Sequence, residues 1–104
     1  MIVTTGNDVV GRAVVSYIGL VRGIVVRSPS VTQGFRGWLK QFIGGNIGAY
    51  AEVCEAAREQ AYQRMVKHAR DKGADAVIAM RYDATEFANG VTEVLVYGTA
   101  VKLA

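Results

Sequence analysis

The sequence predicts an α+β fold in which a mostly antiparallel sheet packs against one short and one long helix, in the order β-β-α-α-β-β. Three observations carry this prediction. Segments rich in Val, Ile and Tyr lie toward both ends of the chain and are typical of strands. Between them, residues 49–72 contain no internal Gly or Pro and are typical of a helix. Near the end, Asn89-Gly90 predicts a hairpin turn, because both residues accept the left-handed conformation.

The first two predicted strands are the short segment from Ile2 to Thr5 and the long region from Arg12 to Arg27. In the longer one, alternate positions on both faces carry Val, Ile, Leu or Tyr, so we expect both faces to be covered. Gly19 and Gly23 fall on one face of this strand. They predict a bulge or the close approach of another backbone.

The two predicted helices lie on either side of a glycine-rich run, residues 44–48. The short helix begins at Ser30, whose spacing to Gln33 fits a capping box, and its apolar stripe ends at Phe42. The long helix, residues 49–72, places acidic residues in its first half and basic residues in its second, which complements the helix dipole. Small residues on its inward face predict that it lies close to a sheet: Val53, Ala57, Ala61, Met65 and Ala69.

A strand over residues 75–86, the Asn89-Gly90 turn and a strand over residues 91–103 complete the predicted fold as a hairpin. Gly98 marks a further bulge within the last strand. A chain of 104 residues is large enough for one domain with a modest core, so we expect a single domain, 1–104.

The composition predicts self-association in the cytoplasm. Apolar residues make up 51% of the chain and charged residues 20%, so part of the apolar surface of so small a domain is expected to be covered by further copies. A single cysteine, Cys54, excludes an intrachain disulfide and indicates a reducing compartment. The N-terminus lacks the pattern of a signal peptide, and Arg22 and Arg27 interrupt the best candidate membrane span. We therefore expect no membrane partner.

Four short motifs lie between residues 44 and 101: Gly44-Gly45-x-x-Gly48-Ala49-Tyr50, Ala57-Arg58-Glu59-x-Ala61, Gly73-Ala74-Asp75-Ala76-Val77 and Gly98-Thr99-Ala100-Val101. Together they resemble the YbjQ-like family of small bacterial proteins, over the range from Thr4 to Val101. The resemblance implies an α+β fold whose subunits assemble into a closed ring, typically a pentamer. It also implies a functionally uncharacterised protein to which heavy-metal binding is ascribed.

The candidate metal ligands are Cys54, Met65 and His68, because soft and borderline metals prefer sulfur and imidazole donors. The cofactor class they suggest is a divalent transition metal. Cys54 and His68 are fourteen residues apart on one predicted helix, or roughly 20 Å at the rise of an α-helix. Since metal–ligand distances are about 2.0–2.3 Å, a shared site would have to be assembled across subunits. The alternative is that Cys54 and Met65 are core residues and His68 faces solvent.

Acidic residues near the predicted hairpin are the second candidate site. Asp83, Glu86 and Glu93 could line a pore in a ring or bind a hard cation such as Mg²⁺ or Ca²⁺. The alternative is an ordinary solvated hairpin tip.

The sequence lacks a recognisable catalytic constellation, so we predict that the protein is not an enzyme. One histidine and one cysteine far apart leave no Cys-His dyad, and no Ser-His-acid combination has a suitable context. The leading prediction is a self-assembling protein that binds a heavy metal or small ligand between subunits.

The alternative function is an oligomeric module that binds nucleic acid or another anion through its basic face. The net charge of +3 is compatible with this function without arguing for it. Arg36 and Lys40 alternate with Trp38 and Phe42, but helical periodicity puts the two pairs on opposite sides of an amphipathic helix. Nucleic acid is therefore not an expected partner.

Overall fold

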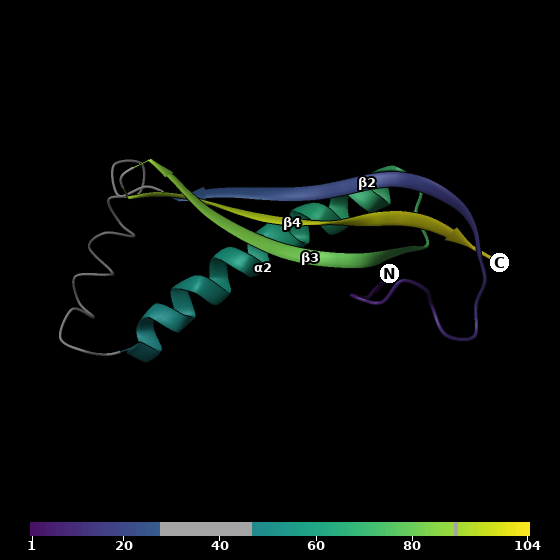
Figure 1. Ribbon diagram of the computed structural model, residues 1–104, viewed down its shortest axis with the longest axis horizontal. Helices are drawn as coiled ribbons and strands as arrows, with labels where there is room; N and C mark the ends of the chain where they lie inside the picture. The colour runs from purple at the N-terminus through teal and green to yellow at the C-terminus, as the bar shows by residue number, and fades with distance from the viewer. Residues whose placement is uncertain (28–46, 89) are drawn as a thin grey trace.

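The computed structural model describes residues 1–27, 47–88 and 90–104, and these form one sheet with a long helix against it (Figure 1). The sheet has four strands in the order β1-β3-β4-β2. The elements, in chain order, are β1 (Ile2–Val3), β2 (Val14–Arg27), α2 (Ile47–Asp71), β3 (Ala76–Ala88) and β4 (Val91–Leu103). The long helix and the three long strands lie within two residues of the predicted positions.

The predicted order β-β-α-α-β-β and the mostly antiparallel sheet are wrong. The described residues have the order β-β-α-β-β with one helix, and the sheet is mixed because β1 runs parallel to β3. The chain continues this parallel contact beyond β1, since Thr4 N–H donates to the Val77 carbonyl (3.0 Å) and Met80 N–H donates to the Thr4 carbonyl (3.0 Å). A two-residue strand has too little pattern to reveal its partner or direction. The short helix predicted from Ser30, and Asn89 of the turn, lie outside the described residues.

Helix α2 packs on one face of β2 and β4 through the small residues that the sequence predicts. Ala57, Ala61, Met65 and Ala69 are buried, and they contact buried valines of β2 and β4 in the main core. The helix comes closest at Gly23, where an added Cβ would overlap the Ala61 carbonyl oxygen. The predicted close approach is therefore confirmed, and a helix lined by alanine is what permits it.

The opposite face of the sheet, which we call the outer face, keeps exposed apolar side chains. Residues that are paired across antiparallel strands lie on the same face of the sheet, and the residues of the outer face point away from α2. Its apolar members are Tyr17, Leu20, Ile24, Val26, Leu95 and Tyr97. Tyr17 is 73% exposed and Leu20 61% exposed, so the described residues of this chain do not themselves cover this face of β2. Whether further copies cover it stays a prediction. One end of this face is covered, because Val9 and Val14 pack there against the cluster that includes Ile78 and Val101.

Four register shifts interrupt the ladders, two between β2 and β4 and two between β3 and β4. The register of β2 against β4 shifts between Tyr17 and Gly19, where Gly19 has φ 130°, so the bulge predicted at this glycine is confirmed. The irregularity nearest to Gly98 lies in β3, between Ile78 and Arg81, and not in β4 as predicted. Gly98 instead accommodates the bulge, because an added Cβ there would lie 3.3 Å from the Met80 Cα.

Candidate functional site

The three predicted metal ligands all lie on α2, and the helix holds them in different surroundings. Cys54 is exposed near the N-terminal end, so the alternative that it is a core residue is wrong. Met65 is fully buried in the main core, as its alternative proposes. His68 is half-buried one turn before the helix ends. The structure does not bring the Cys54 thiol to the other two side chains.

His68 is engaged with the backbone of β2. Its Nδ1 accepts a hydrogen bond from the Arg22 N–H at 3.1 Å. An imidazole that accepts through Nδ1 carries its proton on Nε2 when neutral. In this arrangement neither ring nitrogen therefore has a free lone pair for a metal ion. A metal ion could therefore bind His68 only after the contact with Arg22 is broken or the tautomer is changed.

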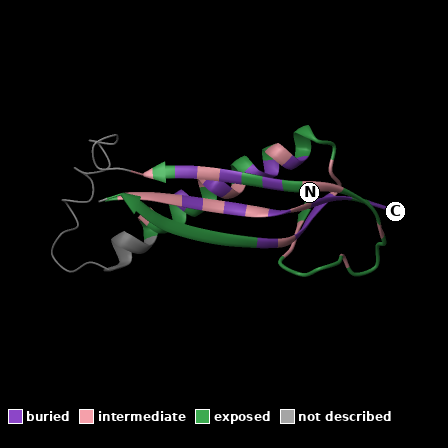
Figure 2. Ribbon diagram, turned by 45° about the horizontal axis from the view of Figure 1, so that its top comes forward, coloured by how far each residue is buried: buried purple, intermediate pink, exposed green. Residues whose placement is uncertain are grey.

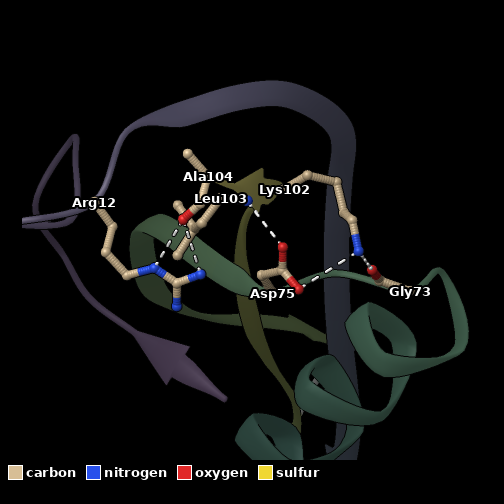
Figure 3. Close-up of polar contacts among 6 residues, drawn as sticks. All are labelled: Arg12, Gly73, Asp75, Lys102, Leu103 and Ala104. Carbon is tan, nitrogen blue, oxygen red and sulfur yellow. Dashed lines mark hydrogen bonds and ion pairs between the residues drawn. The ribbon is translucent and has the colours of Figure 1, made fainter.

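A polar cluster ties the end of α2 to the end of β4 (Figure 3). Asp75 lies between them, and its Oδ2 accepts from the Leu103 N–H at 2.9 Å. Lys102 Nζ donates to the Gly73 carbonyl at 2.9 Å and lies 3.4 Å from Asp75 Oδ1. Beside them, the Arg12 guanidinium donates two hydrogen bonds to the Ala104 carbonyl oxygen, at 3.1 and 3.2 Å. The cluster joins segments that are distant in the sequence.

The electrostatics of this cluster favour a charged Asp75. The hydrogen bond from the Leu103 N–H, helped by the positive charges of Lys102 and Arg12, lowers the pKa of the Asp75 carboxyl below its ordinary value, against the opposing effect of burial. Both oxygens of the Asp75 carboxylate accept a hydrogen bond from the protein, Oδ1 from Lys102 and Oδ2 from the Leu103 N–H. The arrangement is thus suited to joining the end of α2 to the end of β4.

The acidic residues of the β3–β4 hairpin do not converge. Asp83 and Glu93 lie on the outer face, because their cross-strand partners Leu95 and Thr85 do. Glu86 lies on the opposite face, where its Oε1 accepts from the Gly90 N–H at 3.4 Å. Across the residues that the structure describes, no group of three or more His, Cys, Asp or Glu side chains is close enough to hold a metal ion.

A second contact between α2 and the sheet involves Tyr82 of β3. The Arg58 guanidinium carbon lies 5.9 Å from the centre of the Tyr82 ring, a cation–π distance. Burial, followed by the negative charge of Glu59, raises the pKa of the Tyr82 phenol. The phenol therefore stays protonated at neutral pH.

Sequence reasoning missed the role of His68 and the cluster around Asp75. The signal for His68 was available, because Gln60, Arg64 and His68 recur every four residues beside the buried alanine stripe. Nothing local to Asp75 signals its contacts, since its partners lie 27 and 28 residues later in the chain.

The comparisons with known proteins agree with this fold. A family model with the description YbjQ, "Putative heavy-metal-binding", matches residues 1–104. The chain belongs to the YbjQ family. A UPF0145 protein of Legionella pneumophila is 55% identical over 101 residues, covering 97% of this chain and 96% of its own. UPF0145 proteins of Burkholderia thailandensis and Chromobacterium violaceum are 50% and 54% identical, over 91% and 86% of their lengths. The family is functionally uncharacterised.

A solved structure has the same fold at much lower sequence identity. A protein of unknown function of the DUF74 family from Pediococcus pentosaceus superposes with a TM-score of 0.61 and 16% identity, covering 100% of this chain and 98% of that one. At this identity the likeness concerns the fold alone. In the described part of the YbjQ-family chain, no helix is long and apolar enough to cross a membrane.

Proposed function

We propose that this YbjQ-family chain is a non-enzymatic cytoplasmic protein that assembles with copies of itself into a closed ring, a pentamer, and binds a heavy metal or small ligand between subunits. The observation that carries the proposal is the outer face of the sheet. Its exposed apolar members Tyr17, Leu20 and Val26 lie along β2, and the exposed Arg22 stands between Leu20 and Val26 on the same face. Exposed apolar surface interspersed with polar residues marks interaction sites on small proteins.

The proposed ligand site lies between subunits because the helix separates its donors. Cys54 is exposed on α2, and His68 lies three to four turns further along the same helix. A soft metal would therefore be held by Cys54 thiolates from several copies, or by Cys54 of one copy with a donor of the next. The family description, heavy-metal binding, supports this ligand class.

Two measurements test the proposal. Native mass spectrometry of the purified protein reports the subunit count and any retained ion together, and a folded monomer at micromolar concentration would contradict the ring. Zn²⁺, Cu²⁺ and Ni²⁺ are then titrated separately into demetallated wild type, Cys54→Ser and His68→Ala, with Glu52→Gln as a control on the same exposed part of α2. Equal affinity in all four proteins would remove Cys54 and His68 as ligands.

A second candidate function is the binding of nucleic acid or another polyanion, and the C-terminal half of α2 favours it. Three basic residues there are exposed, Arg64, Lys67 and Arg70, and the exposed Lys72 follows directly after the helix. Binding of single-stranded DNA that weakens steeply between 50 and 200 mM salt would support this function, and binding that does not depend on salt would contradict it.

A further inference from the structure

One edge of the sheet is closed by side chains of α2. β2 is an edge strand, so on the side away from β4 its backbone N–H and C=O groups face no other strand among the residues that the structure describes. At the middle of this edge, Arg22 N–H donates to His68 Nδ1, and the Ile24 carbonyl accepts from Arg64 Nη1. Near the end of the strand, Arg27 Nη2 donates to Gln60 Oε1.

These contacts form one continuous row. Gln60, Arg64 and His68 recur every four residues, so they lie along a single stripe of the helix. Arg22 and Ile24 are two residues apart, and their outward backbone groups lie on the same side of β2. The stripe therefore runs along the strand edge, and we call Gln60, Arg64 and His68 the edge guard.

The position of the edge guard matters because β2 is otherwise well suited to pair with another strand. It is 14 residues long, contains no proline and consists mainly of Val, Ile, Leu and Tyr. Leu20 and Val26, on either side of the guarded centre, are 61% and 48% exposed. A long apolar edge strand is a template for strand addition and for open-ended aggregation.

We propose that the edge guard prevents a strand of a second copy from adding to β2. The imidazole and the guanidinium occupy the outward donor of Arg22 and the outward acceptor of Ile24, which an incoming strand would need first. Copies can then meet through side chains of the outer face, but they cannot extend the sheet at this edge. This inference goes beyond the proposed function, because it holds whether or not wild-type chains associate.

A matched pair of substitutions at His68 tests the proposal. His68→Leu removes the acceptor, whereas His68→Asn places an amide oxygen close to the position of Nδ1. In His68→Leu we expect the Arg22 amide to exchange with solvent up to roughly tenfold faster. The Gly23 amide, which faces β4, should keep its wild-type rate. The Arg22 amide of His68→Asn should exchange at close to the wild-type rate.

Assembly provides the second readout. Mass by light scattering, together with thioflavin T fluorescence, should rise continuously with concentration for His68→Leu, and stay at the wild-type value for His68→Asn. Arg64→Met, which frees the Ile24 carbonyl, should behave like His68→Leu, and Lys67→Met is its control on an exposed side of α2. If His68→Leu does not fold, Arg64→Met decides the question.

Three outcomes would overturn the proposal. The first is a folded His68→Leu whose Arg22 amide is protected as in wild type. The second is a mass of His68→Asn that rises with concentration as steeply as the mass of His68→Leu. The third is an Arg64→Met protein with the wild-type mass at every concentration. The mass of wild type itself decides only the proposed ring, so the two proposals fail independently.

Discussion

At the scale of single residues, Gly23 sets the distance between α2 and the sheet. An alanine Cβ there would overlap the Ala61 carbonyl oxygen and lie 2.5 Å from the Met65 backbone nitrogen. Backbone atoms of a helix cannot move aside as a flexible side chain can, so Gly23→Ala should lower the free energy of unfolding by about 1–3 kcal/mol. Urea unfolding followed by circular dichroism measures this loss.

The control for Gly23→Ala is Gly6→Ala, because the nearest atom to an added Cβ at Gly6 is Thr4 Oγ1 at 3.4 Å, an ordinary contact. We expect a change within about 0.5 kcal/mol for this variant. Equal unfolding free energies for the two variants would mean that α2 is not held against β2 at this glycine.

Asp75 predicts a dependence of stability on pH. The pKa of the Asp75 carboxyl is lowered in the folded state. Its contribution to the free energy of unfolding is therefore complete above the unfolded carboxyl pKa of about 3.9, and it is lost as the pH falls through the lowered value. Asp75→Asn should therefore be less stable than wild type at pH 7, with a difference that narrows below about pH 4. Urea unfolding at pH 7, 4 and 3 measures the difference.

Asp71→Asn is the control for the pH experiment, since the Asp71 carboxylate makes an exposed ion pair with Lys67. Exposed ion pairs contribute little to stability, so the unfolding free energy of Asp71→Asn should be close to that of wild type at every pH. If the difference in unfolding free energy between Asp75→Asn and wild type stays constant from pH 7 to pH 3, the charge of the carboxylate does not stabilise the cluster.

At the scale of elements, the bulge in β3 depends on an unusual backbone conformation. Ala79 has φ 53°, and its N–H donates to the Gly6 carbonyl at 2.7 Å. A left-handed conformation costs roughly 1–2 kcal/mol for a residue with a side chain, and β-branched residues adopt it least readily. Ala79→Val should thus be less stable than wild type by about 1–2 kcal/mol, whereas Ala79→Gly should be equal to it or more stable. Thermal unfolding of both variants checks the order, and a Val variant as stable as the Gly variant would exclude strain at the bulge.

The elements that the sequence predicts correctly are those whose pattern is long. Residues 49–72 hold the helical period over six turns, so the buried stripe of Ala57, Ala61 and Ala69 follows directly from spacing. The β3–β4 hairpin follows in the same way, from two long apolar segments joined at Asn89-Gly90. The parallel pairing of β1 does not, because two residues carry no information on strand direction.

The candidate site is less predictable than the fold, because its contacts are made between elements. The spacing of Cys54 and His68 along one helix correctly indicates that they are far apart. It cannot indicate that the His68 ring accepts from the backbone of a strand 46 residues earlier. Nor can it indicate that Cys54 is exposed, because a cysteine beside alanine and valine is compatible with either side of an amphipathic helix.

At the scale of the whole molecule, the outer face should decide whether copies associate. Leu20 and Val26 lie on this face and are exposed, so a charge at either position would be buried without a partner in an interface formed there. The double variant Leu20→Lys, Val26→Lys should be a monomer at concentrations where wild type is a ring. It should fold normally, since neither side chain belongs to the buried core.

The matched control for this double variant places the same charges elsewhere. Ala56 and Gln63 are exposed on α2, so Ala56→Lys, Gln63→Lys adds the same two positive charges away from the outer face. Light scattering at micromolar concentration should give the wild-type mass for this control and the monomer mass for the Leu20, Val26 variant. If both double variants keep the wild-type mass, copies associate through another surface. The candidate is then β3, which is exposed from Arg81 to Ala88 (Figure 2).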